Sequence, residues 1–154
     1  MKKLIALALV VVACHGAAAP RSSAAPESPV RGNLVTGAPD AQSAIKAFLA
    51  ASESQDLQAL GGVFGTATGS ARDAIPRDEL EKRELTMLCY LRHDKYEILS
   101  DAPGTAGTRV FAVQFTRGAL TRSANFDAVQ GPAGRWYVQD FDMPALTDLC
   151  KQKG

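Results

Sequence analysis

The sequence predicts an α+β domain in which three N-terminal helices and a short C-terminal helix pack on a four-stranded antiparallel meander. The stretch at 108–142 alternates apolar and polar residues in three runs separated by glycine-containing turns, the pattern of half-buried strands joined in succession. The stretch at 39–92 instead repeats its large apolar residues every three or four positions, the period of amphipathic helices. The helices are therefore expected to cover one face of the sheet.

The composition is that of a single globular domain with no excess of charge. The chain has 154 residues, of which 46% are hydrophobic and 21% are charged. The chain carries 17 basic and 16 acidic residues. If Lys2 and Lys3 are removed with an N-terminal leader, the numbers of basic and acidic residues stay nearly equal. Nucleic-acid binding normally needs a cluster of basic residues that neutralises phosphates. We therefore expect no nucleic-acid partner.

Residues 1–14 have the pattern of an export signal. Two lysines precede ten uninterrupted apolar residues at 4–13, a run shorter than the roughly 20 residues of a membrane span and typical of a signal peptide. The ending Val-Val-Ala-Cys resembles the bacterial lipobox, whose cysteine receives a diacylglycerol and becomes the new N-terminus. We therefore expect an exported lipoprotein, lipidated on Cys14 and anchored to the cell envelope, with the outer membrane as one destination. An ordinary secretory signal cut near residues 17–19 is the alternative.

Residues 15–38 predict a flexible tether between this leader and the domain. Ala, Pro, Ser and Gly dominate the segment, and large apolar residues are scarce. Such a segment buries too little apolar surface to offset the entropy lost on ordering. The expected organisation is a leader at 1–14, a tether at 15–38 and an α+β domain at 39–154.

Three helices are predicted at 40–54, 56–64 and 76–92. Asp56 is a good N-cap for the second of them. The intervening segment FGTATGSARDAI is polar and rich in glycine, so we expect a loop there. Its glycines lack the strand, helix and lysine context of a phosphate-binding loop. The buried stripe expected on the first helix consists of Ala41, Ile45, Phe48, Leu49 and Ser52.

Four strands are predicted after these helices. The first covers 95–101 and has Tyr96 and Ile98 on one face, and the last, 135–142, is the most aromatic segment of the chain. A short helix is expected to begin at 143–144. In the two central strands the residues expected on the buried face are Phe111, Val113, Phe115, Ala124, Phe126 and Ala128.

The cysteine count allows one disulfide. If Cys14 carries lipid, Cys89 and Cys150 remain in an oxidising envelope, and each falls on a helix that flanks the sheet. Sequence does not supply the distance between their Cα atoms, so a bridge and two buried free thiols both remain open. The chain contains no CxxC and no Cys/His metal spacing. We expect neither a metal ion nor a cofactor.

The order of the predicted elements resembles the nuclear transport factor two-like superfamily, whose curved sheet and helices form a cone. The matching pieces are the opening AIKAFLAASESQDLQAL, with its acid at Asp56, and the late GRWYVQDFD. The resemblance implies that Trp136 and Val138 face the interior of the cone, with Trp136 mostly buried, and that Phe111 and Phe126 also line a pocket there. The superfamily includes isomerase-like and cyclase-like enzymes as well as domains that only bind partners, so the fold constrains function weakly.

Acid–base chemistry inside such a cone would need an inward carboxylate. Asp140 has the strand parity of Trp136 and Val138, so it could face inward if the strand has no bulge, and Tyr96 is then the candidate hydrogen-bond donor. Solvent exposure of Asp140 at the strand end is the interpretation that we favour. His93 next to a helix end is expected to interact with backbone carbonyls rather than to form an acid–base pair.

Two classes of function remain after these considerations. We favour a non-enzymatic domain that binds a small apolar ligand or a protein partner, besides its lipid contact with the membrane. The sheet face with Val110, Ala112, Gln114 and Thr116 is available to a partner. The alternative is a small cone-pocket enzyme of isomerase or cyclase type that uses Asp140.

Overall fold

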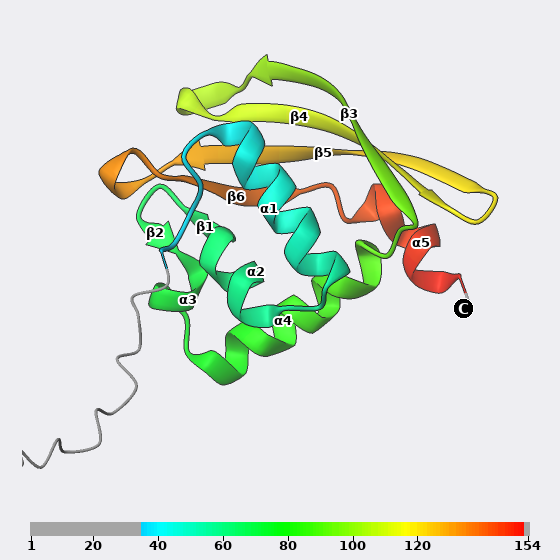
Figure 1. Cartoon of the computed structure of the whole chain (residues 1–154), viewed down its shortest axis with the longest axis horizontal. Coiled ribbons are helices and arrows are strands. Elements are labelled where there is room, and N and C mark those ends of the chain that lie inside the picture. The colour runs from blue at the N-terminus through cyan, green and yellow to red at the C-terminus, as the bar shows by residue number, and fades with distance from the viewer. Residues whose placement is uncertain (1–34, 153–154) are drawn as a thin grey trace, which may run out of the picture. The chain divides into compact units, whose positions relative to one another are not determined.

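Four strands follow one another along the chain and lie side by side in the same order in one antiparallel sheet (Figure 1). The computed structural model describes residues 35–152. The strands are β3 (Lys95–Pro103), β4 (Arg109–Arg117), β5 (Leu120–Gln130) and β6 (Trp136–Phe141). Short 3-10 turns, η1 (Thr105–Gly107) and η2 (Pro132–Gly134), lie between β3 and β4 and between β5 and β6. The predicted four-stranded meander is confirmed.

Helices cover the inner face of this sheet (Figure 1). Helix α1 (Ala41–Glu53) contacts β4, β5 and β6, whereas α2 (Leu57–Val63) contacts α1 and α4 (Arg77–Tyr90). After β6 the chain forms η3 (Pro144–Leu146) and the short C-terminal helix α5 (Thr147–Lys151), which contacts α4. The α+β class and the short C-terminal helix are therefore as predicted.

The segment between α2 and α4 differs from the predicted loop. It contains a small hairpin of β1 (Gly65–Thr66) and β2 (Gly69–Ser70), followed by the one-turn helix α3 (Ala71–Ala74). Ser70 caps α3 by accepting a hydrogen bond from Asp73 N–H at 3.3 Å. The described residues thus form five α-helices, and the prediction of three helices before the sheet is one too few. Elements of two to four residues are too short to show a period in the sequence.

Aspartates cap the first two helices. Asp40 accepts the N–H of Ser43 at 2.8 Å, and Asp56 accepts the N–H of Ala59 at 3.0 Å. The hydrogen bond from Ser43 N–H lowers the pKa of Asp40 below its usual value, because it favours the charged carboxylate. The predicted capping role of Asp56 is confirmed.

Aromatic rings fill the space between α1 and the sheet. Phe126 stacks on Phe141 with ring centroids 5.1 Å apart, and Phe48 meets Phe126 edge-on at 6.3 Å. Phe115 also contacts Phe126, at 5.8 Å. All the residues predicted on the buried stripe of α1 and on the inner faces of β4 and β5 are buried. Rows of alternating residues and a helical stripe therefore meet in a single core.

The end of the predicted tether is built into the fold. Ala38 is 4% exposed and exchanges two backbone hydrogen bonds with Trp136, which makes a short antiparallel bridge at the edge of β6. Arg135 donates through Nε to Thr36 O at 3.1 Å, and Gly37 N–H donates to Gly62 O at 2.8 Å. Residues 36–38, at the end of the predicted tether, are therefore paired with the domain through their backbone groups, and the boundary at residue 38 stays a prediction.

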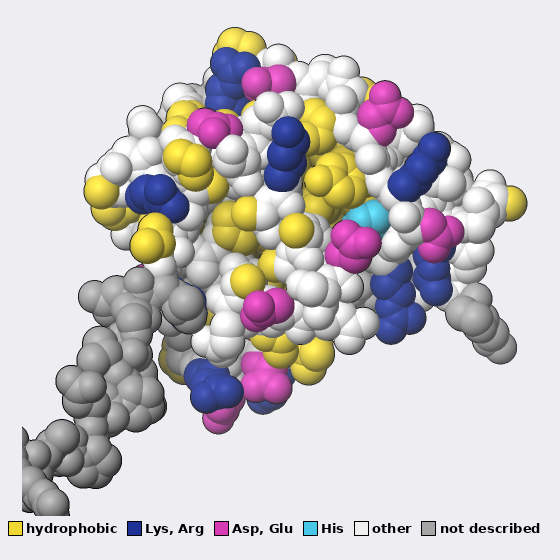
Figure 2. All heavy atoms as spheres, viewed as in Figure 1, with side chains coloured by type: hydrophobic (Ala, Val, Ile, Leu, Met, Phe, Trp, Pro, Cys, Tyr) yellow, Lys and Arg dark blue, Asp and Glu magenta, His cyan; other side chains and the backbone are white. Residues whose placement is uncertain are grey.

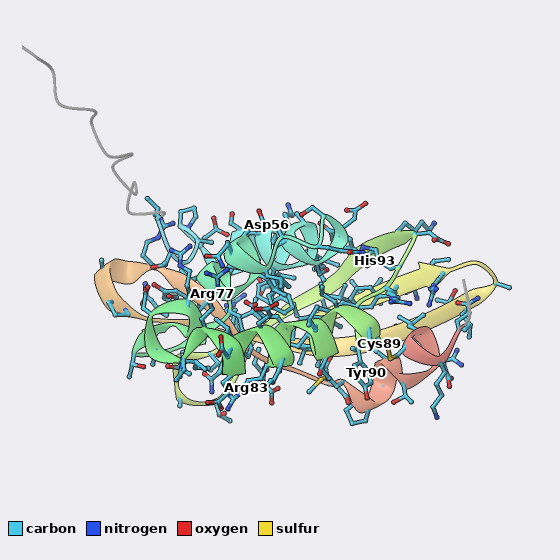
Figure 3. All side chains as sticks on the ribbon, turned by 90° about the horizontal axis from the view of Figure 1, so that it is seen from below. Asp56, Arg77, Arg83, Cys89, Tyr90 and His93 are labelled. Atoms are coloured by element: carbon cyan, nitrogen blue, oxygen red, sulfur yellow. A yellow bond between two sulfur atoms is a disulfide. The ribbon has the colours of Figure 1, made fainter. Side chains whose placement is uncertain are left out.

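A disulfide joins α4 to the C-terminal helix. Cys89 and Cys150 are bonded through their sulfur atoms, and their Cα atoms lie 4.8 Å apart. Figure 3 shows Cys89 at the end of α4 that lies next to α5. Of the two possibilities that the sequence leaves open, the structure has the bridge.

No helix within residues 35–152 has the length and hydropathy required to cross a membrane. The leader at 1–14 and its Cys14 lie outside the described residues.

Candidate functional site

A bulge in β6 turns Asp140 away from the core. β5 pairs Ala128 with Val138 and Asp127 with Asp140, so Gln139 is an extra residue without a partner. The extra residue reverses the alternation, and both Gln139 and Asp140 are exposed while Phe141 is buried. Asp140 is therefore exposed, and the inward position, which requires an unbulged strand, does not occur.

Tyr96, the expected hydrogen-bond donor, lies far from Asp140. Tyr96 pairs with Phe115 of β4 on the inner face. Asp140 pairs with Asp127 of β5, which in turn pairs with Val110 of β4. Five residues along a strand correspond to roughly 17 Å, and an odd number of residues places the two side chains on opposite faces. The two residues do not form a catalytic pair.

The expected pocket residues lie in the packed core. Phe111, Phe126 and Val138 are each 0% exposed, so they border no space that could hold even one water molecule. Trp136 is only partly buried, because it lies at the edge of the sheet opposite Ala38. These three side chains therefore pack against other residues of the core and line no open pocket.

The outer face of the sheet is polar around the expected partner surface. Val110, Ala112, Gln114 and Thr116 are half-buried there, and their neighbours on β5 are Asp127, Asn125, Ser123 and Thr121. A sheet face of this polarity is suited to contact with water and not to contact with an apolar partner.

His93 behaves as expected for a residue at a helix end. Its Nδ1 lies 2.7 Å from Leu91 O, and its ring meets Phe115 and Tyr96 edge-on. The neighbouring Asp94 instead accepts the N–H of Gly118 at 2.7 Å. The two side chains serve separate structural contacts.

A groove of about 420 Å³ lies between the start of α2, α3 and α4. Leu80 and Glu84 of α4 line it together with four further charged side chains, those of Asp56, Arg72, Arg77 and Glu81. In Figure 3, Asp56 lies in the layer of α1 and α2 and Arg77 at the start of α4. Helix α4 therefore supplies most of the groove's ionisable side chains, one or two turns apart.

Glu84 is the unusual residue of this groove. Its side chain is 3% exposed, and Oε1 has no hydrogen-bond partner within the described residues. Burial raises the pKa of Glu84 to about 7, and the negative charge of Glu81 raises it further. A hydrogen bond with the backbone of Gly61 lowers the pKa and offsets part of this shift. A buried acceptor without a donor is costly, so it marks a candidate site for a ligand.

Two glycines in α2 make room for the charged side chains. A Cβ atom on Gly61 would lie 2.5 Å from Glu84 Oε1 and 2.9 Å from Leu80 Cδ2. On Gly62 it would lie 3.4 Å from Arg72 Nη1. Glycine weakens a helix interior by about 1 kcal/mol relative to alanine, so its presence at 61 reflects the close approach of α4.

A second, apolar hollow lies on the other side of α4. Phe64, Met87 and Met143 line it, with Lys82 and Arg83 at its border, and its volume is about 430 Å³. Arg83 is already paired with Glu79 one turn earlier. On the face shown in Figure 2, acidic and basic side chains are interspersed, in agreement with the balanced composition.

Sequence reasoning missed Glu84 although a signal was present. The residue lies four positions after Leu80 and four before Leu88, so it falls on the apolar stripe of α4. An acid on such a stripe is buried unless the helix is rotated.

Residues 35–152 contain no group of three or more His, Cys, Asp or Glu side chains that could hold a metal ion. No protein-family model matches the chain, and neither the curated proteins nor the solved structures include a significant match.

Proposed function

We propose that this protein is a non-enzymatic binding domain whose site is the groove over Glu84. The observation that carries the proposal is the buried carboxyl oxygen of Glu84, which lines the groove and has no donor within the described residues. A ligand that donates a hydrogen bond would satisfy this oxygen and offset the cost of its burial. The sequence expectation of an apolar ligand is thereby replaced with a polar one.

The positions of the acid–base candidates support binding over catalysis. An isomerase or cyclase needs a carboxylate within reach of a substrate proton in an enclosed pocket. Asp140 is exposed on the outer face, and the inner face is filled by fully buried rings such as Phe111 and Phe126. The Asp140→Asn protein should therefore keep every ligand affinity of the parent protein.

The proposal places this domain outside the cytoplasmic membrane. The lipobox-like ending at Cys14 supports export and lipidation, and the segment that follows it would connect the anchor to the bridge at Ala38. The lipid anchor and the nuclear transport factor two-like ancestry stay predictions from the sequence. Labelling of cells with a palmitate analogue tests the anchor, because a Cys14→Ser protein that still became acylated would contradict it.

The binding site can be tested by nuclear magnetic resonance. A set of small cations, anions, zwitterions and neutral polar molecules is added to the ¹⁵N-labelled protein, and backbone amide shifts are recorded. We expect perturbed amides to cluster at Leu57, Gln58, Arg72, Arg77 and Glu81, which surround the groove. Turnover of a compound, or perturbations confined to the outer face of the sheet, would contradict the proposal.

A matched pair of variants separates the groove from the rest of the surface. Glu84→Gln keeps the shape of the side chain but removes its charge, and it should weaken any ligand that contacts the groove floor. Glu97→Gln makes the same chemical change on exposed β3 and should leave binding unchanged.

A further inference from the structure

The groove over Glu84 offers charges of both signs to one small molecule. Asp56 reaches it from the start of α2, Arg72 from α3, and Arg77, Glu81 and Glu84 from α4. Arg77 has no ion-pair partner within the described residues. The groove thus combines a guanidinium available to an anion with a buried oxygen that requires a donor.

We propose that the groove binds a small zwitterion of the α-amino acid class, an inference that rests on the proposed function. The ammonium group would donate to the carboxylate of Glu84 on the floor, and the carboxylate would pair with the guanidinium of Arg77 near the start of α4. Charge-assisted bonds of both kinds are stronger than neutral ones, and Arg binds carboxylates with two parallel donors.

The charge balance of the groove favours this class over its competitors. A simple anion would approach Arg77 but would lie beside Glu81, whereas a simple cation would leave Arg77 without a partner. An apolar ligand would leave Glu84 Oε1 without a donor, which costs on the order of 1–3 kcal/mol. A volume of about 420 Å³ accommodates a free amino acid with a side chain of moderate size.

Binding of the ammonium group is linked to the proton on Glu84. The charged groups around that carboxyl are Asp56 from α2, Arg72 from α3, and Arg77 and Glu81 from its own helix. With its pKa at about 7, Glu84 is mostly neutral at pH 6 and mostly ionised at pH 8. An amino acid keeps both of its charges over this interval, so its affinity should rise about tenfold from pH 6 to pH 8 and then level.

Isothermal titration of the purified protein with free L-amino acids tests this inference. At pH 7, where the amino group of an ester or a peptide, with a pKa of about 7.7–8.0, is still mostly charged, alanine, alanine methyl ester and N-acetylalanine serve as the zwitterion, the cation and the anion of one skeleton. Alanyl-alanine extends the test to a peptide. We expect the free amino acid to bind at least ten times more tightly than either singly charged derivative. If alanyl-alanine binds as tightly as alanine, the site recognises the ends of peptides and is not specific for free amino acids.

Two variants make the result specific to the groove. Glu84→Gln should weaken the amino acid about tenfold at pH 8 and remove the rise in affinity with pH. Arg77→Gln should weaken the amino acid and N-acetylalanine but leave the methyl ester unchanged. Lys95→Gln on exposed β3 removes one positive charge elsewhere and should change none of these affinities.

The outcomes separate this inference from the proposed function. If only cations or only anions bind and their footprint lies in the groove, the amino acid class is wrong while the binding function stands. If the zwitterion binds but its affinity does not depend on pH in the parent protein, the contact with Glu84 is wrong. If no compound of any charge shifts the amide signals of the residues that line the groove, both proposals are wrong.

Discussion

The carboxyl group of Glu84 lies so close to the backbone of Gly61 that any side chain at residue 61 would collide with it. A Cβ atom there would be 2.5 Å from Oε1, well inside contact distance. The contact joins α2 to α4 at the floor of the groove. The packing of α2 on α4 and the position of Glu84 in the groove therefore depend on a single pair of residues.

Substitution of Gly61 with alanine should destabilise the protein by about 1–3 kcal/mol. The new methyl group would overlap both Glu84 Oε1 and Leu80 Cδ2. These atoms are side-chain ends, but both residues are buried, at 3% and 5% exposed, so they have little room to move and the overlap outweighs the gain in helix propensity. Urea unfolding followed by circular dichroism gives the free energy of unfolding.

The adjacent glycine supplies the control. A Cβ atom on Gly62 meets only the flexible end of Arg72, at 3.4 Å, so Gly62→Ala should be neutral or stabilise the protein by up to about 1 kcal/mol. Equal destabilisation by the two substitutions would mean that the close approach of α4 is not the cause.

Glu84 should make the protein less stable as the pH rises. Its pKa increases from 4.5 to about 7 on folding, so the folded state binds the proton more tightly and the unfolded state loses it first. Stability is therefore lost between about pH 4.5 and pH 7 and stays low above pH 7, with a total change of about 3 kcal/mol.

The Glu84→Gln protein should lack this decline. Unfolding free energies measured from pH 5 to pH 8 give the slope for each protein, and Asp40 and Asp148, whose pKa values are lowered, titrate below this range. Parallel curves for the parent and the variant would show that Glu84 is ionised throughout.

Truncation of the central aromatic ring should be severe. Phe126 is 0% exposed and contacts the rings of Phe48, Phe115 and Phe141, so Phe126→Ala should cost about 3–5 kcal/mol in unfolding free energy. Leu85→Ala on α4 is the control, because Leu85 is 55% exposed and should change stability by about 0.5 kcal/mol or less.

Removal of the disulfide should loosen the C-terminal helix. Cys89 and Cys150 are 61 residues apart, and closure of a loop of that length contributes about 4 kcal/mol at most. The protein with both cysteines replaced by serine should melt at a lower temperature, with early hydrogen exchange in α5. Unchanged protection of α5 would show that packing of Leu146 and Leu149 is sufficient to hold it.

The sequence predicts long, periodic elements well and local irregularities poorly. The residues at 111, 113 and 115 alternate without interruption, and the structure buries all three. The bulge at Gln139 inserts one residue into β6, and no local signal in WYVQDF distinguishes that strand from a regular one. One inserted residue is enough to place Asp140 on the outer face, whereas the parity of a regular strand would place it on the inner face.

The candidate site could have been predicted only in part. Glu84 stands on the apolar stripe of α4, so its burial is visible in the spacing, and the capping role of Asp56 was predicted. The close approach of Gly61 depends on how α2 and α4 cross, which is set by contacts distant in sequence. The disulfide remained open for the same reason, because its formation depends on a distance between two helices.

The bridge between Ala38 and Trp136 also determines how this domain responds to mechanical load. Among the described residues, those at 36–38 make the first contacts with the domain, so a pull on the chain before Val35 would load their hydrogen bonds first. Two of these bonds join Ala38 to Trp136, so the same pull would act directly on β6. Release of three residues lengthens the connection by roughly 10 Å. The edge of the sheet at Trp136 is thus the point at which a load on the preceding chain would enter the domain.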